Sequence, residues 1–553
     1  MQYTIHLANP LEHLLEITLS LSAPDDTLEL VLPLWRPGRY EAANYSKNLR
    51  SVSFFDDNDT SLSYDKTDAN RWTVDTRKTK NVTVKYEYYA FAMDAGNSYY
   101  DEELIYINFI NCLMYSPKTT QSKCKVSINI PSEYEVACAL SNSHHVFEST
   151  DFYELVDSPL MASKNIDLKS YNVGETQFNI WVYGVHNIDL KQLTSDFKKF
   201  SEAQISSLGE FPEDEYHFLL LILPYKHYHG VEHAKSTVIC LGPGNEVGEG
   251  KLYSELLGVS SHELFHAWNI IKIRPKEMMP YDFSREVTFP TGLVAEGFTT
   301  YYGDLYLCRG KVFDTQWYFD ELNTLFNRHF WNYGRLNESV ITSSLNLWID
   351  GYVQGAPHKK SSIYVEGAMI ALCLDLIIRK QTSSEKSLDD VLHLLWEKHG
   401  KTQVGYSLEE IKLYCEAIYG ESLDAFFKDY VFGARDKYDL VDELLGFVGC
   451  NLVQIPNENF LTRYLGLRGV SNEASKLKIL QIAPGSIGQE FFSVNDEINS
   501  IDGNKPEEYK PLMNEPSVFE IRRNSRERVI EVSIDPNLQY YHNHIIEKQK
   551  QPT

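Results

Sequence analysis

The apolar residues of this chain change their spacing twice, and this constrains the fold more than any other feature of the sequence. In the first 170 residues or so, apolar side chains alternate or run together in short segments, which clusters of Gly, Pro, Asn and Asp separate. The clearest segments are YTIHLA, LLEITLSLS, LELVLPLW, RWTVDT, NVTVKYEYYAF, CKVSINI and YEVACAL. Short strands at this spacing are typical of an antiparallel β-sandwich, so we expect an N-terminal β domain over residues 1–172.

After the first β domain, the apolar residues take the spacing of helices. Two strand-like segments, FNIWVYG and YHFLLLILPY, precede longer segments in which apolar residues recur every three or four positions. These longer segments cover residues 254–271, 292–307, 314–330, 366–380, 387–399, 407–418 and 422–430. A small sheet followed by a mostly helical lobe is therefore predicted for residues 173–447.

Strand character returns near the C-terminus. The segments LKILQIAP, VNDEINSIDG, SVFEIRR and RVIEVSID surround one gap the size of a helix, which predicts a second β domain over residues 448–537. Residues 538–553 form a polar tail that we expect to fray. A chain of 553 residues is too long for one core, and the three patterns together predict a multidomain α+β protein.

The amino-acid composition limits which partners the protein is expected to bind. Apolar residues make up 43% of the chain and charged residues 23%, which is typical of a globular protein. The net charge of −25 repels phosphate, so nucleic acid and anionic membranes are not expected as partners. The longest apolar run, at 218–223, is far shorter than a membrane span, and the eight scattered cysteines indicate reduced thiols. We expect a cytoplasmic protein, although a signal peptide already removed would leave the same sequence.

A metal-binding pattern lies in the first of the helical segments. His262-Glu263-Leu264-Phe265-His266 has the form H-E-x-x-H. Residues four apart lie one turn above each other on one face of a helix, so the imidazoles of His262 and His266 can bind one ion, and Glu263 can reach the water on it. Zinc accepts nitrogen ligands, and a catalytic zinc keeps one position open. One catalytic Zn²⁺ ion is predicted here.

The next helical segment supplies a third ligand. Glu296 lies in TGLVAEGFTTYY among apolar neighbours, where an unpaired carboxylate would be costly to bury. A salt-bridged helix glutamate is the alternative, but the nearby histidine pair favours a metal ligand. Two histidines and one glutamate are the usual ligand set of a zinc peptidase.

The N-terminal β domain contains no catalytic constellation that we can identify from the sequence. Its segment W-R-P-G-R-Y, at 35–40, has the composition of a shaped loop. We interpret it as a structural turn.

Two motifs of the helical region carry a family resemblance. H-E-L-F-H-A-W-N followed by A-E-G-F-T-x-Y-Y resembles the glycyl aminopeptidase family of gluzincin metallopeptidases, and DAFFKDYVFG resembles the end of that family's catalytic domain. The resemblance implies an N-terminal β domain, a thermolysin-like catalytic domain and a C-terminal PDZ domain, in the order predicted above. It also implies a preference for small N-terminal residues such as glycine and alanine.

The resemblance extends to a substrate-binding segment. The sequence G-V-E-H that ends at His233 resembles the family's G-x-E-H segment, which implies that Glu232, with Gly230 and His233 beside it, anchors the free α-amine of a peptide. Its place between two strand-like segments also predicts an edge strand that pairs with an extended peptide. A solvent-facing loop glutamate is the alternative. A second metal site at the three local histidines, which include His227 and His229, is disfavoured because no acidic cluster accompanies them.

A catalytic tyrosine is implied as well. Tyr364, in S-I-Y-V-E-G, resembles the tyrosine that precedes a helix in gluzincins, where a phenol donates to the oxyanion. The chain departs from the pattern here, because Glu366 replaces the usual basic residue before the glycine. A packing tyrosine is the alternative.

The C-terminal β domain carries the segment Y-L-G-L, whose last residues are Leu465, Gly466 and Leu467. It resembles the carboxylate-binding loop of PDZ domains, whose backbone amides would bind a peptide C-terminus. The alternative is a module that only packs against the catalytic domain.

Together these features predict a zinc-dependent aminopeptidase that acts on peptides with a free N-terminus. The same residues also allow two other enzyme functions, namely a zinc endopeptidase and an epoxide hydrolase. A third belongs to another class: a PDZ-type peptide-binding protein whose peptidase domain is not catalytic.

Overall fold

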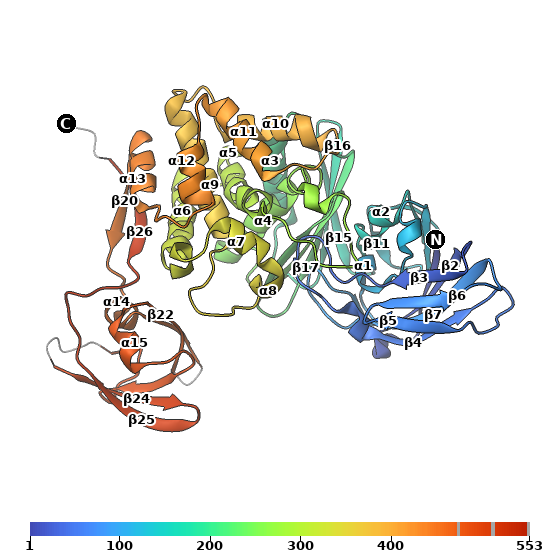
Figure 1. Ribbon diagram of the computed structural model, residues 1–553, viewed down its shortest axis with the longest axis horizontal. Coiled ribbons are helices and arrows are strands. Elements are labelled where there is room, and N and C mark those ends of the chain that lie inside the picture. The colour runs from blue at the N-terminus through green and yellow to red at the C-terminus, as the bar shows by residue number, and fades with distance from the viewer. Residues whose placement is uncertain (473–475, 510–514, 550–553) are drawn as a thin grey trace. The chain divides into compact units, whose positions relative to one another are not determined.

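The computed structural model of the protein describes residues 1–472, 476–509 and 515–549 (Figure 1). The chain divides into two compact units. The first unit comprises Met1–Asp314, Leu345–Tyr352 and Asp389–Tyr414, and the second comprises the remaining segments.

The first unit begins with a β domain that contains the strands expected from the alternating apolar pattern. Its strands are β1 (Gln2–Leu7), β2 (Leu14–Ser22), β3 (Thr27–Val31), β4 (Leu49–Phe55), β5 (Tyr64–Asp68), β6 (Arg71–Asp75), β7 (Asn81–Tyr89), β8 (Tyr99–Tyr100), β9 (Ile105–Ile107), β10 (Cys124–Ile128), β11 (Glu135–Ala137), β12 (Ser141–Ser143), β13 (Val146–Ser149) and β14 (Leu160–Ser163). Two short helices, α1 (Phe109–Cys112) and α2 (Phe152–Val156), interrupt them. The helix α2 matters for the site, because its C-terminal end reaches the edge of the next sheet.

These strands form three sheets. Their orders are β12-β13-β10-β1-β2-β7-β4, β11-β14-β9-β8 and β3-β6-β5. The pair β1·β10 is parallel and the other pairs of this β domain are antiparallel, so the domain departs from the purely antiparallel sandwich that we expected. The long stretch of chain between β1 and β10 supplies the crossover that a parallel pair requires.

A five-stranded mixed sheet follows, in the order β15-β16-β17-β19-β18. Its strands are β15 (Ile166–Val173), β16 (Thr176–Tyr183), β17 (Glu215–Ile222), β18 (His227–Glu232) and β19 (Ser236–Gly242). The central strands β16, β17 and β19 are parallel, and β17 is an almost continuous apolar run because it is buried on both faces. The strand β18 pairs antiparallel with β19 at the edge, which confirms the predicted edge strand.

The helices α3 (Leu190–Leu208) and α4 (Gly250–Phe265) contact this sheet (Figure 1). The first unit also contains the π-helical turn η5 (Leu293–Phe298), α5 (Thr299–Arg309), α8 (Leu347–Asp350), most of α10 (Leu388–Leu395), the π-helical turn η7 (Trp396–Gly400) and the first part of α11 (Leu408–Tyr419). The helix α4 contacts β18, β19 and α5. It ends six residues before the predicted 271, because the amides of Ala267 and Trp268 bond three residues back, which tightens the last turn and ends the helix.

The second unit contains the remaining helices and the C-terminal β domain. Its helices are α6 (Thr315–Phe330), α7 (Val340–Leu345), α9 (Ile363–Gln381), α12 (Asp424–Phe426), the π-helical turn η8 (Phe427–Val431) and α13 (Tyr438–Phe447). The helices α6 and α13 both contact α9. A two-stranded sheet of β20 (Cys450–Ile455) and β26 (Asn543–Lys548) contacts α6 and α13.

The C-terminal β domain lies in sequence between these two strands. It consists of α14 (Phe460–Leu465), β21 (Leu467–Ser471), β22 (Leu477–Ile482), α15 (Ile487–Phe491), β23 (Glu497–Ile501), β24 (Ser517–Arg523) and β25 (Arg526–Val532). The strands form one antiparallel sheet in the order β21-β22-β23-β24-β25 around a core of its own.

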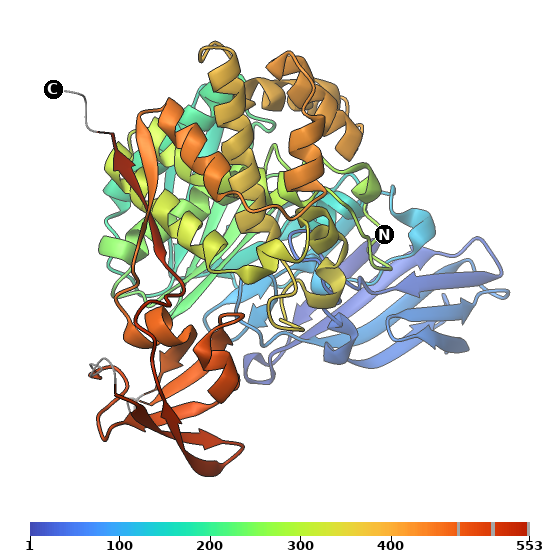
Figure 2. The ribbon, with the colours of Figure 1, turned by 60° about the vertical axis from the view of Figure 1, so that its left-hand side comes forward.

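The expected polar tail contains a strand. In β26, the amides of His544 and Ile546 donate to the side chains of Asn327 and Asn323 on α6, at 2.7 and 2.8 Å. The C-terminal β domain is therefore inserted between two paired strands (Figure 2). Residues 550–553 of the expected tail lie outside the described residues.

Among the residues that the structure describes, no helix combines the length and the hydropathy that crossing a bilayer requires. The eight cysteines are free thiols, as the sequence indicated.

Candidate active site

The predicted metal ligands converge in the first unit. The Nε2 atoms of His262 and His266 lie 3.1 Å apart at the end of α4. The Oε2 atom of Glu296 lies 3.4 Å from Nε2 of His266 and 3.8 Å from Nε2 of His262. A tetrahedral zinc ion with bonds of about 2.0–2.1 Å holds its ligand atoms about 3.4 Å apart. The donor set therefore fits one zinc ion, with a fourth position left for a small ligand.

Hydrogen bonds around the ligands fix their orientation. Nδ1 of His266 donates to the carbonyl oxygen of Asn269 at 2.6 Å, which leaves its Nε2 lone pair for a metal. The side-chain amide of Asn269 donates to the carbonyl oxygen of Val294 at 2.7 Å and to Oγ1 of Thr299 at 3.1 Å. These bonds tie the chain after α4 to the π-helical turn η5, from which Glu296 projects. Such π-helical turns are frequent at functional sites.

Two further carboxylates lie beside this triad. One ligand atom each of Glu232, Glu263 and His266 lie within 4.8 Å of one another, and all three side chains are buried. Oε1 of Glu232 and Oε2 of Glu263 accept no hydrogen bond from any described residue. Buried carboxylates without partners are costly, so this cluster favours a bound cation.

The pKa shifts in the cluster agree with a preference for a bound cation. Burial raises the pKa of Glu232 and raises the pKa of Glu263 to about 8. Burial alone would lower the pKa of His266, but the attraction of Glu296 and Glu232 outweighs it and raises the pKa to about 10. A positive charge is therefore stabilised at the centre of the cluster.

The edge strand β18 brings Glu232 and Gly230 to the metal helix. A Cβ atom at Gly230 would lie 2.2 Å from Oε1 of Glu263, so only glycine lets that carboxylate lie against the strand. The end of the strand is held by Asp157 at the C-terminus of α2. Its carboxylate accepts from Nδ1 of His233 at 3.0 Å and from the amide of Ala234 at 2.8 Å. His233 thus supports the strand that presents Glu232.

The loop at 35–40, which we interpreted as a structural turn, belongs to the site. Gly38 has a φ of +78°, and a Cβ atom there would lie 2.3 Å from Oε2 of Glu232. The hydroxyl of Tyr40 donates to Oε1 of Glu296 at 3.4 Å. The indole of Trp35 anchors the loop by donating to the carbonyl oxygen of Asp282 at 2.8 Å. The β domain therefore supplies part of the wall around the metal ligands.

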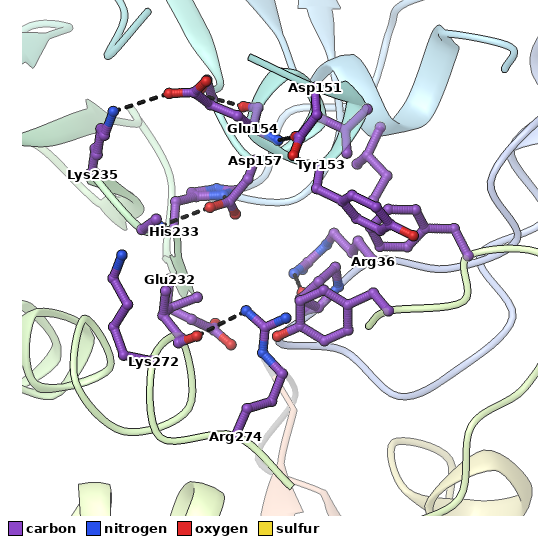
Figure 3. Close-up of a pocket in the computed structure, with 18 of the residues that line it drawn as sticks. Arg36, Asp151, Tyr153, Glu154, Asp157, Glu232, His233, Lys235, Lys272 and Arg274 are labelled. Atoms are coloured by element: carbon purple, nitrogen blue, oxygen red, sulfur yellow. Dashed lines mark hydrogen bonds and ion pairs between the residues drawn. The ribbon is translucent and has the colours of Figure 1, made fainter. Parts of the chain in front are cut away.

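A pocket of about 380 Å³ opens beside Glu232 (Figure 3). The loop at 35–40 and α2 line one side of it, and the segment after α4 lines the other. Among the metal-site side chains, Glu232 alone lines this pocket.

Two family models match the chain. The model of the peptidase M61 N-terminal domain matches residues 2–164, and the model of the M61 glycyl aminopeptidase matches residues 255–370, which include the three ligands and Glu263.

The chain belongs to the M61 glycyl aminopeptidase family.

It is accordingly a peptidase. The family assignment confirms the resemblance of the N-terminal and catalytic regions to this family.

A solved structure shows the same fold. An aminopeptidase N family protein from Idiomarina loihiensis matches with a TM-score of 0.90 and 24% identity, over 99% of this chain and 98% of that chain. An M1 zinc metallopeptidase from Deinococcus radiodurans gives a TM-score of 0.46 at 13% identity, over 79% of this chain and 93% of that chain, which is too weak to support an inference. No curated protein matches the sequence.

The other predicted site residues of this M61 peptidase lie in the second unit. Tyr364 is the second residue of α9, two positions after the N-cap Ser362, and its role in the oxyanion site stays a prediction. In the C-terminal β domain, Leu465 ends α14, and Leu467 begins β21; both are buried in the domain core. Gly466 between them has a φ of 65°, and its amide donates to the carbonyl oxygen of Leu461. That amide is thus used within the chain.

Proposed function

We propose that this M61 peptidase is a zinc-dependent aminopeptidase that removes residues from the free N-terminus of peptides. The observation that supports this most directly is the convergence of His262, His266 and Glu296 within 3.8 Å, with the carboxylates of Glu263 and Glu232 beside them.

The three ligands would hold one zinc ion, which when bound supplies a Lewis acid and a water of lowered pKa. Glu263 lies beside that position, so its carboxylate is placed to take the proton of the attacking water and to deliver it to the leaving amine. Gly230 keeps Glu263 close to the edge strand along which the peptide would lie.

Glu232 provides the selectivity for a free N-terminus. Its carboxylate is buried, one of its oxygens has no hydrogen-bond partner among the described residues, and it ends the edge strand β18. An extended peptide that pairs with β18 would bring its α-ammonium to this carboxylate. Because the anchor lies within 4.8 Å of a ligand atom of His266, there is room for one residue between the anchored amine and the scissile carbonyl.

Two further roles remain proposals from the family resemblance. Tyr364 would donate its phenol to the oxyanion of the attacked carbonyl. The loop of Leu465, Gly466 and Leu467 would bind a peptide C-terminus, with the amide of Gly466 already bonded to Leu461. The preference for small N-terminal residues is likewise a proposal from the family resemblance.

An endopeptidase is the second candidate, because it would use the same zinc ligands. The buried carboxylate of Glu232 argues against it, since an uncharged peptide bond in that place would leave the carboxylate unpaired. Cleavage of peptides with an N-acetyl group at rates similar to free peptides would favour the endopeptidase.

Hydrolysis of aminoacyl anilides tests the proposal. The full chain loaded with zinc should release the anilide from substrates with a free amine, lose this activity with a chelator, and regain it when zinc is added back. N-acetylated anilides should be poor substrates. Activity that persists without metal, or equal activity on acetylated substrates, would contradict the proposal.

A further inference from the structure

The pocket beside Glu232 is large for the side chain of a small residue. Its volume of about 380 Å³ lies in the range of pockets that bind small molecules. The side chain of an N-terminal residue held by Glu232 would point either along β18 or into this pocket. A glycine or alanine would leave it nearly empty, so the lining indicates what larger side chain it accepts.

Most charged groups of the pocket are already paired. Nζ of Lys235 lies 3.0 Å from Glu154, and Nζ of Lys272 lies 2.5 Å from Glu213. Asp157, as described above, is bonded at both oxygens. The two lysines are therefore neutralised by glutamates, whereas Asp157 is held by a histidine ring and a backbone amide.

Two charged groups of opposite sign form no salt bridge with any residue that the structure describes. Glu232 is the first, with its free buried oxygen. Arg274 is the second: its guanidinium donates to the carbonyl oxygens of Ile270 at 3.5 Å and Ile271 at 2.8 Å, and lies 3.9 Å from the centre of the Tyr281 ring. No carboxylate of the described residues lies within 4.0 Å of it. Figure 3 shows both groups facing the pocket.

Arg36 adds a second guanidinium to the same pocket. It donates to the carbonyl oxygen of Pro37 at 3.0 Å and lies 3.3 Å from Nε2 of His229, so it too forms no ion pair at this wall. The buried rings of Tyr281 and Phe283 add apolar surface to the lining. A ligand that matches these groups would present a cation to Glu232 and an anion to Arg274.

We propose that this pocket binds the side chain of the substrate's N-terminal residue, and that the preferred residue is glutamate or aspartate. The α-ammonium would pair with Glu232 and the side-chain carboxylate with Arg274, which presents a planar set of donors suited to a carboxylate. The inference rests on the proposed aminopeptidase function and departs from the preference for small residues that the family resemblance implies.

Paired substrates test the inference in the unmodified, zinc-loaded protein. The anilides of glutamate and glutamine differ only in the group that would meet Arg274, as do those of aspartate and asparagine. We expect kcat/KM for the acidic member to exceed that of its amide by about 10-fold or more, because a charged hydrogen bond replaces a neutral one. Free L-glutamate should also inhibit alanyl-anilide hydrolysis at a lower concentration than free L-glutamine.

The outcomes separate this inference from the proposed function. If alanyl or glycyl anilides are hydrolysed but the acidic substrates are no better than their amides, this inference is wrong and the aminopeptidase stands. If no anilide is hydrolysed at all, the proposed function fails and the inference falls with it.

Single substitutions test whether Arg274 causes the preference for an acidic N-terminal residue. Arg274→Gln should reduce the glutamate-to-glutamine ratio of kcat/KM toward one, and Arg274→Lys should restore part of it. Lys272→Gln is the matched control, because it removes a charge from the same pocket that is already paired with Glu213. An unchanged ratio in Arg274→Gln, or an equal fall in Lys272→Gln, would overturn the assignment. The inhibition by free amino acids decides the question even where a variant fails to fold.

Discussion

At the residue scale, the site places three buried glutamates close together and gives each a different neighbour. Glu296 faces two imidazoles and the hydroxyl of Tyr40. Glu263 lies against Gly230, and Glu232 lies against Gly38. The same chemical group can therefore act as a metal ligand, a base or an anchor, since its surroundings decide which cation or proton it meets.

Glu263→Gln tests the role of the base. The amide has almost the same shape, so the variant should bind zinc as the unmodified protein does. It cannot accept a proton, so turnover of the best anilide should fall by about 10²–10⁴-fold. The measurement is kcat together with zinc content from metal analysis. Near-full turnover with zinc bound would show that another group takes the proton.

The ligand triad could be predicted from the sequence because helix geometry fixes it. Four-residue spacing places His262 and His266 on one face, and the next helical segment offers Glu296 among apolar residues. Gly38 and Tyr40 could not be found in this way, because they lie 194 and 256 positions before the glutamates they touch, and only the tertiary fold brings them together. The one local signal was a Pro-Gly pair, which indicates a turn but not what the turn contacts.

At the element scale, the loop at 35–40 makes the β domain part of the catalytic site. The left-handed backbone of Gly38 lets the loop pass the carboxylate of Glu232 without a side chain between them. The loop therefore limits where that carboxylate can lie.

Gly38→Ala tests this contact. The new methyl group would both strain a positive φ and displace Oε2 of Glu232. We expect a loss of stability of about 1 kcal/mol and a fall in kcat/KM of about 10-fold or more, mostly through KM. Gly174→Ala is the matched control, because Gly174 has a φ of +58° with nothing within 4 Å of the new atom. It should lose similar stability and keep its activity. Equal activity losses in both would mean that strain alone explains the effect.

A buried ionic cluster stabilises the helix α9 in the second unit. The carboxylate of Glu366 is bonded to Lys437 and lies 2.9 Å from Nδ1 of His329 on α6. Although burial opposes its charge, these two partners lower the pKa of Glu366 from 4.5 to about 2. The residue that departs from the family pattern thus has a structural partner in this chain.

The lowered pKa predicts how acid acts on this unit. A carboxyl group with a depressed folded pKa contributes stability above pH 4.5, and this contribution is lost as the pH falls toward 2. It corresponds to roughly 3 kcal/mol in total. Glu366→Gln should therefore be less stable than the unmodified protein near pH 6, and the difference should narrow as the pH falls below 4.5. Urea unfolding at several pH values measures it. A constant difference would contradict the assignment.

Element boundaries were predicted less well than the elements themselves. The helices and most strands follow from apolar spacing, but the end of α4 and the π-helical turn η5 depend on Asn269, whose side chain bonds to a distant segment. The strand β26 was missed because its sequence NHIIEK has few apolar residues. Its backbone is paired by β20 and by two asparagines of α6, which no local pattern reveals.

At the scale of the whole molecule, β26 explains how the C-terminal β domain is attached. The two strands on either side of it are paired from Cys450 opposite Lys548 to Ile455 opposite Asn543. At the neck, the side-chain amide of Asn457 donates to the carbonyl oxygen of Tyr541 at 3.3 Å. The domain therefore enters and leaves the second unit at one place, and the last strand belongs to the unit rather than to a free tail.

This arrangement predicts opposite results for two deletions. Ending the chain after His542 removes β26, which leaves β20 unpaired and the asparagines of α6 without their backbone partners. Because buried polar groups without partners cost about 1–3 kcal/mol each, the second unit should unfold at a clearly lower temperature. Replacing residues 458–540 by an Asn-Gly turn removes more chain but keeps both strands, and such a turn suits a two-stranded hairpin. We expect this shortened protein to keep the thermal midpoint of the second unit within a few degrees, since the lost contacts, such as that of His358 with the carbonyl oxygen of Ile482, lie at its surface. Circular dichroism melting of both proteins measures the difference. If the short truncation is harmless and the internal deletion is not, the stabilising element is the C-terminal β domain and not β26.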